Sequence, residues 1–233
     1  MRAAVLLIGL TCLGCHSRSP RSYTWSYTPE PPKTRAPRIA GSVAVPPAID
    51  QRSDARVDNV GFDIFPLVPF GWYEYARPER TEPEHLDWTL GDWRFQPSED
   101  IAKAVAAELA ASGLFDEVFY ASPAPKGTLV LSVTIESTLA EGRIITYGLS
   151  MAGPVLWLFG LPSGTLHSDL KLAFELTDQV TGRSLWSARC ERSFDDPDYG
   201  LYDPTPGFQY DTMLKDMLVT EVLPALEYLS PTP

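Results

Sequence analysis

The middle of the chain alternates apolar and polar residues in a way that predicts β-strands. Residues 128–135 and 168–177 each place a leucine, valine, isoleucine or phenylalanine at every second position, with mostly polar residues between them. The Thr-Gly pair at 181–182 predicts a hairpin turn into a further strand over 184–192. Cys190 falls on the apolar face of that strand, so we expect a buried and unreactive thiol.

Two stretches have the period of an amphipathic helix. In residues 97–112, Ser98 stands where a side chain can cap the first turn, two carboxylates follow it, and apolar residues recur at every fourth position. Gly113 then supplies the left-handed residue that commonly ends a helix. Residues 208–229 carry a similar apolar stripe, and Pro224 predicts a kink in this second helix.

The order of these elements predicts the fold class. A β-rich stretch precedes the first helix, a short strand and three or four antiparallel strands follow, and a helix ends the chain. This order predicts an α+β fold, in which a mostly antiparallel sheet of about five strands has two helices packed on one face. We expect one domain over residues 57–233, with an insertion near 72–95 and an apolar loop near 150–166.

The amino terminus has the features of an export signal. A basic residue precedes an apolar run over residues 3–13, which is shorter than the roughly 20 residues that a spanning helix needs. The run ends in Cys12-Leu13-Gly14-Cys15, which resembles the lipobox of bacterial lipoproteins, although Cys12 stands where that family usually has Leu. The resemblance implies that residues 1–14 are a signal peptide and that Cys15 becomes the lipidated amino terminus. Because His16 rather than Asp follows it, the family's sorting pattern implies the periplasmic face of the outer membrane.

The same cysteines allow a second interpretation. Residues 12–16 also read C-x-x-C-H, the attachment motif of c-type haem. Their position at the end of the apolar run favours the lipobox, because signal processing would remove Cys12. Signal processing would leave two cysteines, the lipidated Cys15 and Cys190. We therefore expect no intramolecular disulfide and no bound cofactor.

Charge divides the chain into two parts. Residues 16–56 contain seven prolines, seven Lys or Arg and three acidic residues, with little apolar periodicity, which predicts a lipidated tether over residues 15–56. This tether is either a solvated linker or a basic segment that lies against anionic headgroups. From residue 57 onward, 11 basic and 27 acidic residues give a net charge of −16. The net charge of the whole chain, −11, argues against a nucleic-acid partner, because few cations remain to meet phosphates.

One segment, residues 144–166, carries no formal charge. It is long enough to span a membrane, but its glycines and prolines recur at short intervals and argue against a spanning helix. Two other interpretations stay open: a loop buried against the sheet, which we favour, and an exposed loop that touches a membrane or a partner. The candidate interaction residues in this segment are the five consecutive large apolar ones, Val155, Leu156, Trp157, Leu158 and Phe159.

Residues that could form a nucleophilic site occur without the pattern that such chemistry needs. The sequence around Ser150 has one residue too many for a nucleophile elbow and does not lie between a core strand and a helix. Cys190 and His167 could form a thiol dyad, but Cys190 belongs to an apolar strand face. His85 and His167 have no second histidine or cysteine at ligand spacing, so a zinc site is not expected.

The carboxylates give no stronger signal. Glu136 and Glu141 could be a glycosidase pair, but surface carboxylates near a turn explain them as well. A cluster of aspartates between residues 195 and 203 could hold Ca²⁺, yet it does not follow the EF-hand pattern. We therefore expect neither an enzyme nor a metal site.

With these elements placed, the chain resembles a family of small α/β domains found in bacterial envelope lipoproteins and periplasmic factors. The resemblance covers residues 57–229 and rests on Pro-Phe at 69–70, on E-L-A-A-S-G-L-F at 108–115, on the strand at 128–135 and on D-x-x-T-G-x-x-L-W-S at 178–187. Members are the curli-secretion lipoprotein, the amino-terminal domain of the Tol-system propeller protein and the lipoprotein activators of penicillin-binding proteins. The resemblance implies a domain that binds or assembles and has no catalytic residues.

The expected function is that of a non-catalytic, lipid-anchored envelope protein, which acts as a binding or assembly module. Its expected partners are the membrane, through the lipid, and a protein of the envelope. An alternative is an accessory lipoprotein of envelope lipid trafficking that presents residues 144–166 to acyl chains. A third possibility, an envelope hydrolase, lacks a catalytic constellation.

Overall fold

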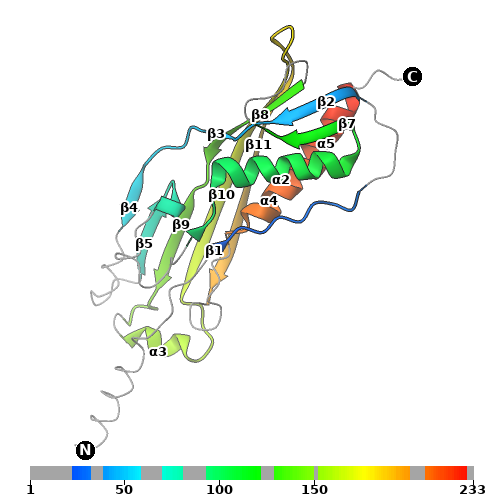
Figure 1. The fold of residues 1–233 in the computed structure, drawn as a ribbon. Coiled ribbons are helices and arrows are strands. Elements are labelled where there is room, and N and C mark those ends of the chain that lie inside the picture. The colour runs from blue at the N-terminus through cyan, green and yellow to red at the C-terminus, as the bar shows by residue number, and fades with distance from the viewer. Residues whose placement is uncertain are drawn as a thin grey trace, which may run out of the picture.

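The protein, described by a computed structural model, consists of a twisted sheet with helices on one face (Figure 1). The structure describes residues 23–32, 39–58, 70–80, 93–121, 129–149, 152–199 and 208–229. The strands are β1 (Tyr23–Thr24), β2 (Ile39–Val45), β3 (Ile49–Asp50), β4 (Arg56–Asp58), β5 (Phe70–Tyr75), β6 (Trp93–Arg94), β7 (Phe115–Tyr120), β8 (Leu129–Ser137), β9 (Ala140–Ile145), β10 (Gly164–Asp178) and β11 (Arg183–Asp198). The helices are η3 (Pro78–Arg80), α2 (Pro97–Ser112), α3 (Pro154–Trp157), α4 (Tyr210–Met217), η6 (Leu218–Val222) and α5 (Leu223–Leu229).

The main sheet is large and mixed. Among the described residues it has nine strands in the order β4-β5-β9-β10-β8-β2-β7, with β11 paired to β10 and β3 paired to β8. β2 runs parallel to β7 and β8, and β3 runs parallel to β8, whereas the other pairs in this sheet are antiparallel. The expectation of a mostly antiparallel sheet of about five strands, with two helices packed on one face, is therefore wrong. Parallel pairs join segments that are far apart in the chain, and local alternation does not reveal them.

The longest pairing is the hairpin of β10 and β11. Buried residues alternate along β10, and the register places Leu172 opposite Cys190 on the face that packs against the helices. Gly182, with a φ of 67°, turns the chain between the strands at the predicted position. On the opposite face Lys171 forms an ion pair with Glu191 at 2.7 Å. One face of the hairpin therefore belongs to the core and the other is polar.

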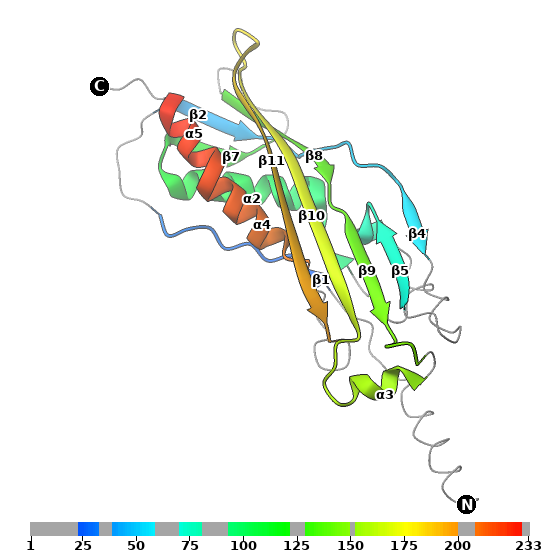
Figure 2. The same cartoon turned by 180° about the vertical axis from the view of Figure 1, so that it is seen from behind.

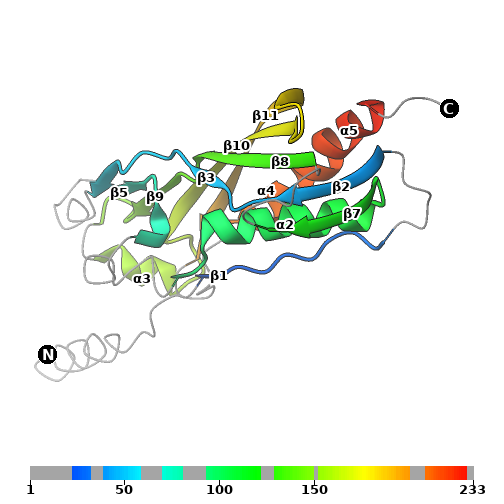
Figure 3. The same ribbon diagram turned by 45° about the horizontal axis from the view of Figure 1, so that its top comes forward.

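Helix α2 spans the predicted residues and covers one half of the sheet, beside β2, β7 and β8 (Figure 3). Pro97 stands in the first turn, where its missing N–H leaves no bond unmade. The backbone N–H of Gln96 donates to the carboxylate of Asp100 at 2.7 Å, so the contact that closes the first turn comes from Asp100 and not from the predicted cap Ser98. Gly113 ends the helix with a φ of 65°, as predicted.

The C-terminal helices α4, η6 and α5 follow one another without a break and share one apolar stripe. A wider helical turn lies within them. In η6, a π-helical turn, the N–H of Leu223 bonds to the carbonyl of Leu218, five residues earlier. Pro224 follows at once; its ring would crowd the carbonyl four residues earlier in a regular α-helix. The wider turn removes that conflict. The irregularity predicted at Pro224 thus takes the form of a π-turn in front of it.

Residues 23–32, which we call the strap, run beside α2 and α4 (Figure 1) and contact both helices, because Tyr27 bonds to Glu108 of α2 and Glu30 pairs with Lys215 of α4. The ring of Tyr23 is buried and packs edge-on against Phe208 and Tyr210, with centroid distances of 5.5 and 6.2 Å. The hydroxyl of Tyr27 donates to Glu108 of α2 at 2.7 Å. The strap and residues 39–56 belong to the folded body, whereas the sequence predicts a tether over 15–56.

Candidate functional site

The β9–β10 connection forms a projection at one end of the sheet, which we call the apolar knob (residues 146–149 and 152–163). It contains α3 and lies at the opposite end of the long strands from the hairpin tip at Gly182 (Figures 1 and 2). The uncharged segment 144–166 is therefore divided between two strand ends and the knob. A membrane-spanning helix over this segment, the least favoured interpretation, is wrong.

Backbone hydrogen bonds order the knob internally. Its N–H groups donate to carbonyls within the knob over distances of 2.9 to 3.4 Å, at Thr146, Leu149, Gly153, Leu156 and Trp157. Both the N–H and the hydroxyl of Ser163 donate to the carbonyl of Asp198, at 2.7 and 2.8 Å, and so join the knob to β11. The knob is thus a folded unit and not an unstructured loop.

Trp157 attaches the knob to the sheet. Its side chain is only 5 % exposed, and its indole N–H donates to the carbonyl of Ile145, the last residue of β9, at 2.9 Å. Gly153 lies so close to Thr146 that an added Cβ would stand 2.6 Å from the Thr146 carbonyl oxygen. Only glycine fits there, because a Cβ never approaches an oxygen so closely.

The five candidate interaction residues divide between the two sides of the knob. Trp157 is buried and Leu156 is half-buried, whereas Val155, Leu158 and Phe159 are exposed. Phe159 is the most exposed of them, at 80 %. Leu149 and Leu161 of the knob are also exposed. The structure combines the two open interpretations, since one side packs on the sheet and the other presents apolar side chains outward.

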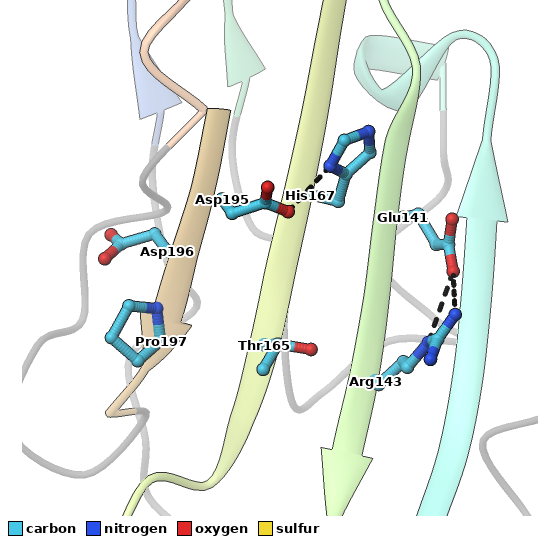
Figure 4. A pocket seen from close by; sticks show the side chains of 7 residues that line it. All are labelled: Glu141, Arg143, Thr165, His167, Asp195, Asp196 and Pro197. Carbon is cyan, nitrogen blue, oxygen red and sulfur yellow. Dashed lines mark hydrogen bonds and ion pairs between the residues drawn. The ribbon is translucent and has the colours of Figure 1, made fainter. Parts of the chain in front are cut away.

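A polar cleft of about 520 Å³ lies on the open face of the sheet near the knob (Figure 4). Three neighbouring strands line it with Glu141, Arg143, Thr165, His167, Asp195, Asp196 and Pro197. The guanidinium of Arg143 donates to Glu141 at 3.1 and 3.3 Å. His167, the other basic side chain of the lining, also has carboxylate partners. Both basic side chains of the cleft are therefore already paired.

His167 is held on both sides of its ring. Nδ1 lies 2.7 Å from a carboxylate oxygen of Asp195, and Nε2 lies 3.1 Å from Asp169. The hydrogen bond with Asp195 is the main reason why the pKa of His167 is raised, and Asp169 adds to it against the opposing effect of burial. Because each ring nitrogen already has a carboxylate oxygen within hydrogen-bond distance, neither nitrogen is left facing an open position for a substrate proton.

Cys190 is buried, as predicted, with 2 % of its surface exposed. Burial, followed by a hydrogen bond with Glu221, raises the pKa of its thiol to about 12. Cys190 lies opposite Leu172 on the core face, whereas His167 lies on the open face, so the strand register keeps the two apart. The structure therefore does not form the thiol dyad.

The remaining carboxylate candidates do not converge. Glu136 is paired with Arg189 at 2.7 Å, and Glu141 is paired with Arg143. Residues 195–198 lie in β11, so alternation along the strand turns Asp195 toward the face opposite to that of Asp196. Among the residues that the structure describes, no group of three or more His, Cys, Asp or Glu could hold a metal ion.

Several sequence candidates lie outside the described residues, namely Cys15, His16, His85, Ser150 and Asp203. In the described part of the chain, no helix combines the length and the apolar character needed to cross a membrane.

The cleft was not predicted, because its residues come from three strands that only the pairing register brings together. The signal that could have indicated it is the row of polar residues at alternate positions 165, 167 and 169. A row of this kind marks the solvent face of a strand without indicating which strand lies beside it.

Comparisons with known proteins give little further information. No family model matches the chain, and no curated protein matches it. A solved structure that is similar is that of protein XCC0632 from Xanthomonas campestris, of the family DUF330. The two chains are 12 % identical with a TM-score of 0.48, and the match covers 89 % of this chain and 95 % of that chain. Neither a family nor an activity follows from a likeness at this level, and the resemblance to envelope lipoprotein domains stays a prediction.

Proposed function

We propose that this protein is a non-catalytic, lipid-anchored cell-envelope protein that acts as a binding or assembly module. Cys15 carries the lipid and holds the protein at the periplasmic face of the outer membrane. The observation that carries the binding role is the apolar knob, which presents Val155, Leu158 and Phe159 outward from a hydrogen-bonded backbone. Large apolar side chains held rigidly in contact with solvent are typical of an interaction surface.

The site chemistry favours binding over catalysis. His167 is occupied at both ring nitrogens, the thiol of Cys190 is buried, and Glu141 is paired with Arg143. Lipid trafficking, the second candidate, calls for a groove that can enclose acyl chains. The cleft on the sheet is lined mainly by charged and polar side chains, and the knob projects from the end of the sheet, so contact with a surface fits better than enclosure of a lipid.

The anchor is tested by comparing Cys15→Ser with Cys12→Ser in a bacterial host that processes lipoproteins. We expect the parent chain and Cys12→Ser to incorporate a clickable fatty acid and to fractionate with the outer membrane. Cys15→Ser should incorporate none and leave that fraction. Intact mass of the purified parent gives the first residue and the number of acyl chains.

Two results would contradict the proposal. Equal loss of fatty acid from both cysteine variants would argue against Cys15 as the acylated residue. The absorbance of a c-type haem in the parent, lost in both variants, would support the alternative C-x-x-C-H interpretation.

A further inference from the structure

We propose that the apolar knob is a second membrane contact, which rests in the headgroup region of the same bilayer that holds the lipid on Cys15. This inference rests on the proposed function, because it takes the lipid anchor as the first contact. The partner of the exposed side of the knob is a lipid surface of zwitterionic headgroups. Val155, Leu158 and Phe159 are the residues that enter it.

The chemistry of the knob matches an interface between water and lipid. Residues 144–166 carry no formal charge, so no ionised side chain has to leave water when the knob is in contact with lipid. Two exposed tyrosines accompany the exposed apolar side chains, Tyr147 within the knob and Tyr199 just after β11. Aromatic side chains with a polar tip are typical of the headgroup level of a membrane.

The backbone of the knob also meets the main requirement of an apolar medium. A carbonyl or N–H that loses water needs a partner inside the protein. Several N–H groups of the knob already donate within it, among them those of Leu149, Leu156, Phe159, Gly160 and Leu161. The hydroxyl of Tyr147 donates to the carbonyl of Pro162 at 2.7 Å. Shallow contact with lipid therefore leaves these groups satisfied.

The length of chain before the strap keeps the body close to the membrane. Residues 16–22 separate Cys15 from Tyr23, and a chain of that length reaches at most about 28 Å when fully extended. From Tyr23 the strap runs away from the knob end of the molecule, toward the end that holds α5 (Figures 1 and 2). The folded body therefore meets its N-terminal extension on the half of the molecule that carries the knob.

Strand geometry places the base of the knob within that reach along the strand direction. Tyr23 packs on Tyr210, whose hydroxyl donates to the carbonyl of Thr138 at 3.0 Å. The N–H of Asp169 in β10 bonds to the carbonyl of Leu139, the residue after Thr138. Tyr23 therefore lies near the level of Asp169, which is five residues from the start of β10. Five strand residues span about 17 Å. The N-terminal extension reaches further than this distance along the strand, so the lipid can come level with the base of the knob.

Charge near the knob selects the kind of lipid. The end of β11 beside the knob carries three aspartates, at 195, 196 and 198. These carboxylates disfavour a surface of anionic lipids. We therefore commit to a bilayer of zwitterionic headgroups, such as phosphatidylethanolamine with phosphatidylcholine.

The test reads the depth of the knob directly. A chain that begins at residue 16 with a histidine tag is bound to vesicles of zwitterionic lipid that contain a nickel-chelating lipid. This chain keeps every residue of the hydrophobic core, which extends from Tyr23 to Leu226. Phe159→Cys receives an environment-sensitive fluorophore, and Val180→Cys is the matched control, because Val180 is 76 % exposed and lies at the opposite hairpin tip. Cys190 is buried and stays unlabelled.

We expect brominated lipids to quench the label at position 159 at least about twofold and to leave the label at position 180 unchanged. Adding Val155→Glu with Leu158→Glu should abolish the quenching at 159 without moving the unfolding midpoint, because both side chains are exposed. The inference is overturned if the label at 159 stays in water, as it would if the knob binds a protein. Equal quenching at both positions also overturns it.

The tag separates this inference from the proposed anchor. If the mass of the parent shows no lipid on Cys15 while the tagged chain still has its label quenched at 159, the anchor fails and the lipid contact stands. If Cys15 is acylated but the label at 159 stays in water, the anchor stands and the lipid contact fails. Repeating the measurement with the lipidated parent, labelled at 159, checks that the natural anchor gives the same depth.

Discussion

Ser168 places a hydroxyl at a core position of β10, between the buried side chains of Leu166 and Leu170. Its side chain is fully buried, opposite Ala140 on β9 and Phe194 on β11, and its oxygen has no hydrogen-bond partner among the described residues. A buried hydroxyl without a partner loses its water and gains nothing in return. The position is therefore a local weakness of the core.

We expect Ser168→Ala to leave the free energy of unfolding unchanged or to raise it by up to about 1 kcal/mol. The matched control is Ser163→Ala, because the hydroxyl of Ser163 donates to the carbonyl of Asp198 at 2.8 Å and its loss should cost about 1 kcal/mol. Urea unfolding of both variants measures the difference. A loss of stability in Ser168→Ala as large as that in Ser163→Ala would show that the hydroxyl of Ser168 has a partner after all.

His167 links stability to pH through its two carboxylate neighbours. Its pKa is raised in the folded protein, first by the hydrogen bond with Asp195. A raised pKa means that the folded state binds the proton more tightly, so the contribution to stability is fully present below the unfolded value of about 6.5 and is lost as pH rises through the folded value.

We therefore expect His167→Gln to lower the melting temperature more at about pH 5.5 than at about pH 9. The effect will be small, because the side chain is 34 % exposed and solvent weakens its ion pairs. Asp195→Asn is the control: it removes the main partner and should reduce the pH dependence of the His167→Gln effect. Melting curves of the parent, the two single variants and the double variant at both pH values test this. An equal loss of melting temperature at both pH values would argue against a charged histidine.

Between elements, a buried arginine joins β3, η3 and the β8–β9 junction. The guanidinium of Arg52 donates to both oxygens of Asp50 at 2.9 Å and to both oxygens of Glu79 at 3.1 and 2.6 Å. It also reaches the hydroxyl of Thr138. The hydrogen bond from Arg52 is the main reason why the pKa of Asp50 lies below its usual value. This cluster fastens the segment that follows β2 onto the sheet.

We expect Arg52→Met to lower the free energy of unfolding by about 2–3 kcal/mol, because it leaves the half-buried carboxylates of Asp50 and Glu79 without their main cation. Lys103→Met is a control of the same chemistry at the surface, where Lys103 pairs with Glu99 at 2.6 Å. That pair is exposed, so its loss should change stability by less than about 0.5 kcal/mol. Urea unfolding separates the two outcomes, and similar losses in both variants would contradict the role of burial.

The elements that local pattern predicts are those whose neighbours are close in sequence. Helix α2, the buried side of β8 and the β10–β11 turn were predicted because each shows its period within a short window. β2 was missed because its seven residues lie in a stretch whose prolines and basic residues suggested a tether. The exposed half of the knob could not be predicted, since an apolar run reads alike whether it packs on a sheet or faces outward.

At the scale of the whole molecule, the strap decides where the folded body begins. Its aromatic residues stand at every second position, Tyr23, Trp25 and Tyr27, a period that could have indicated an extended segment packed on one side. Trp25 stacks on Phe95 with a centroid distance of 4.9 Å. Glu108 is buried and accepts from the hydroxyl of Tyr27 and from the N–H of Glu30. The strap thus covers apolar surface and satisfies a buried charge.

We expect a chain that begins at residue 33 to be less stable than a chain that begins at residue 16 by about 5 kcal/mol. Tyr23 and Trp25 lose their packing, and burial of one large side chain contributes about 1.5–3 kcal/mol. Glu108 also loses the hydrogen bonds from Tyr27 and from the N–H of Glu30. Tyr27→Phe in the longer chain keeps the ring and removes only the hydroxyl, and it should cost about 1–3 kcal/mol. Urea unfolding of the three proteins gives the comparison. If residues 16–32 were a solvated tether, all three would unfold at the same urea concentration, and the N-terminal extension would no longer hold the knob near the membrane.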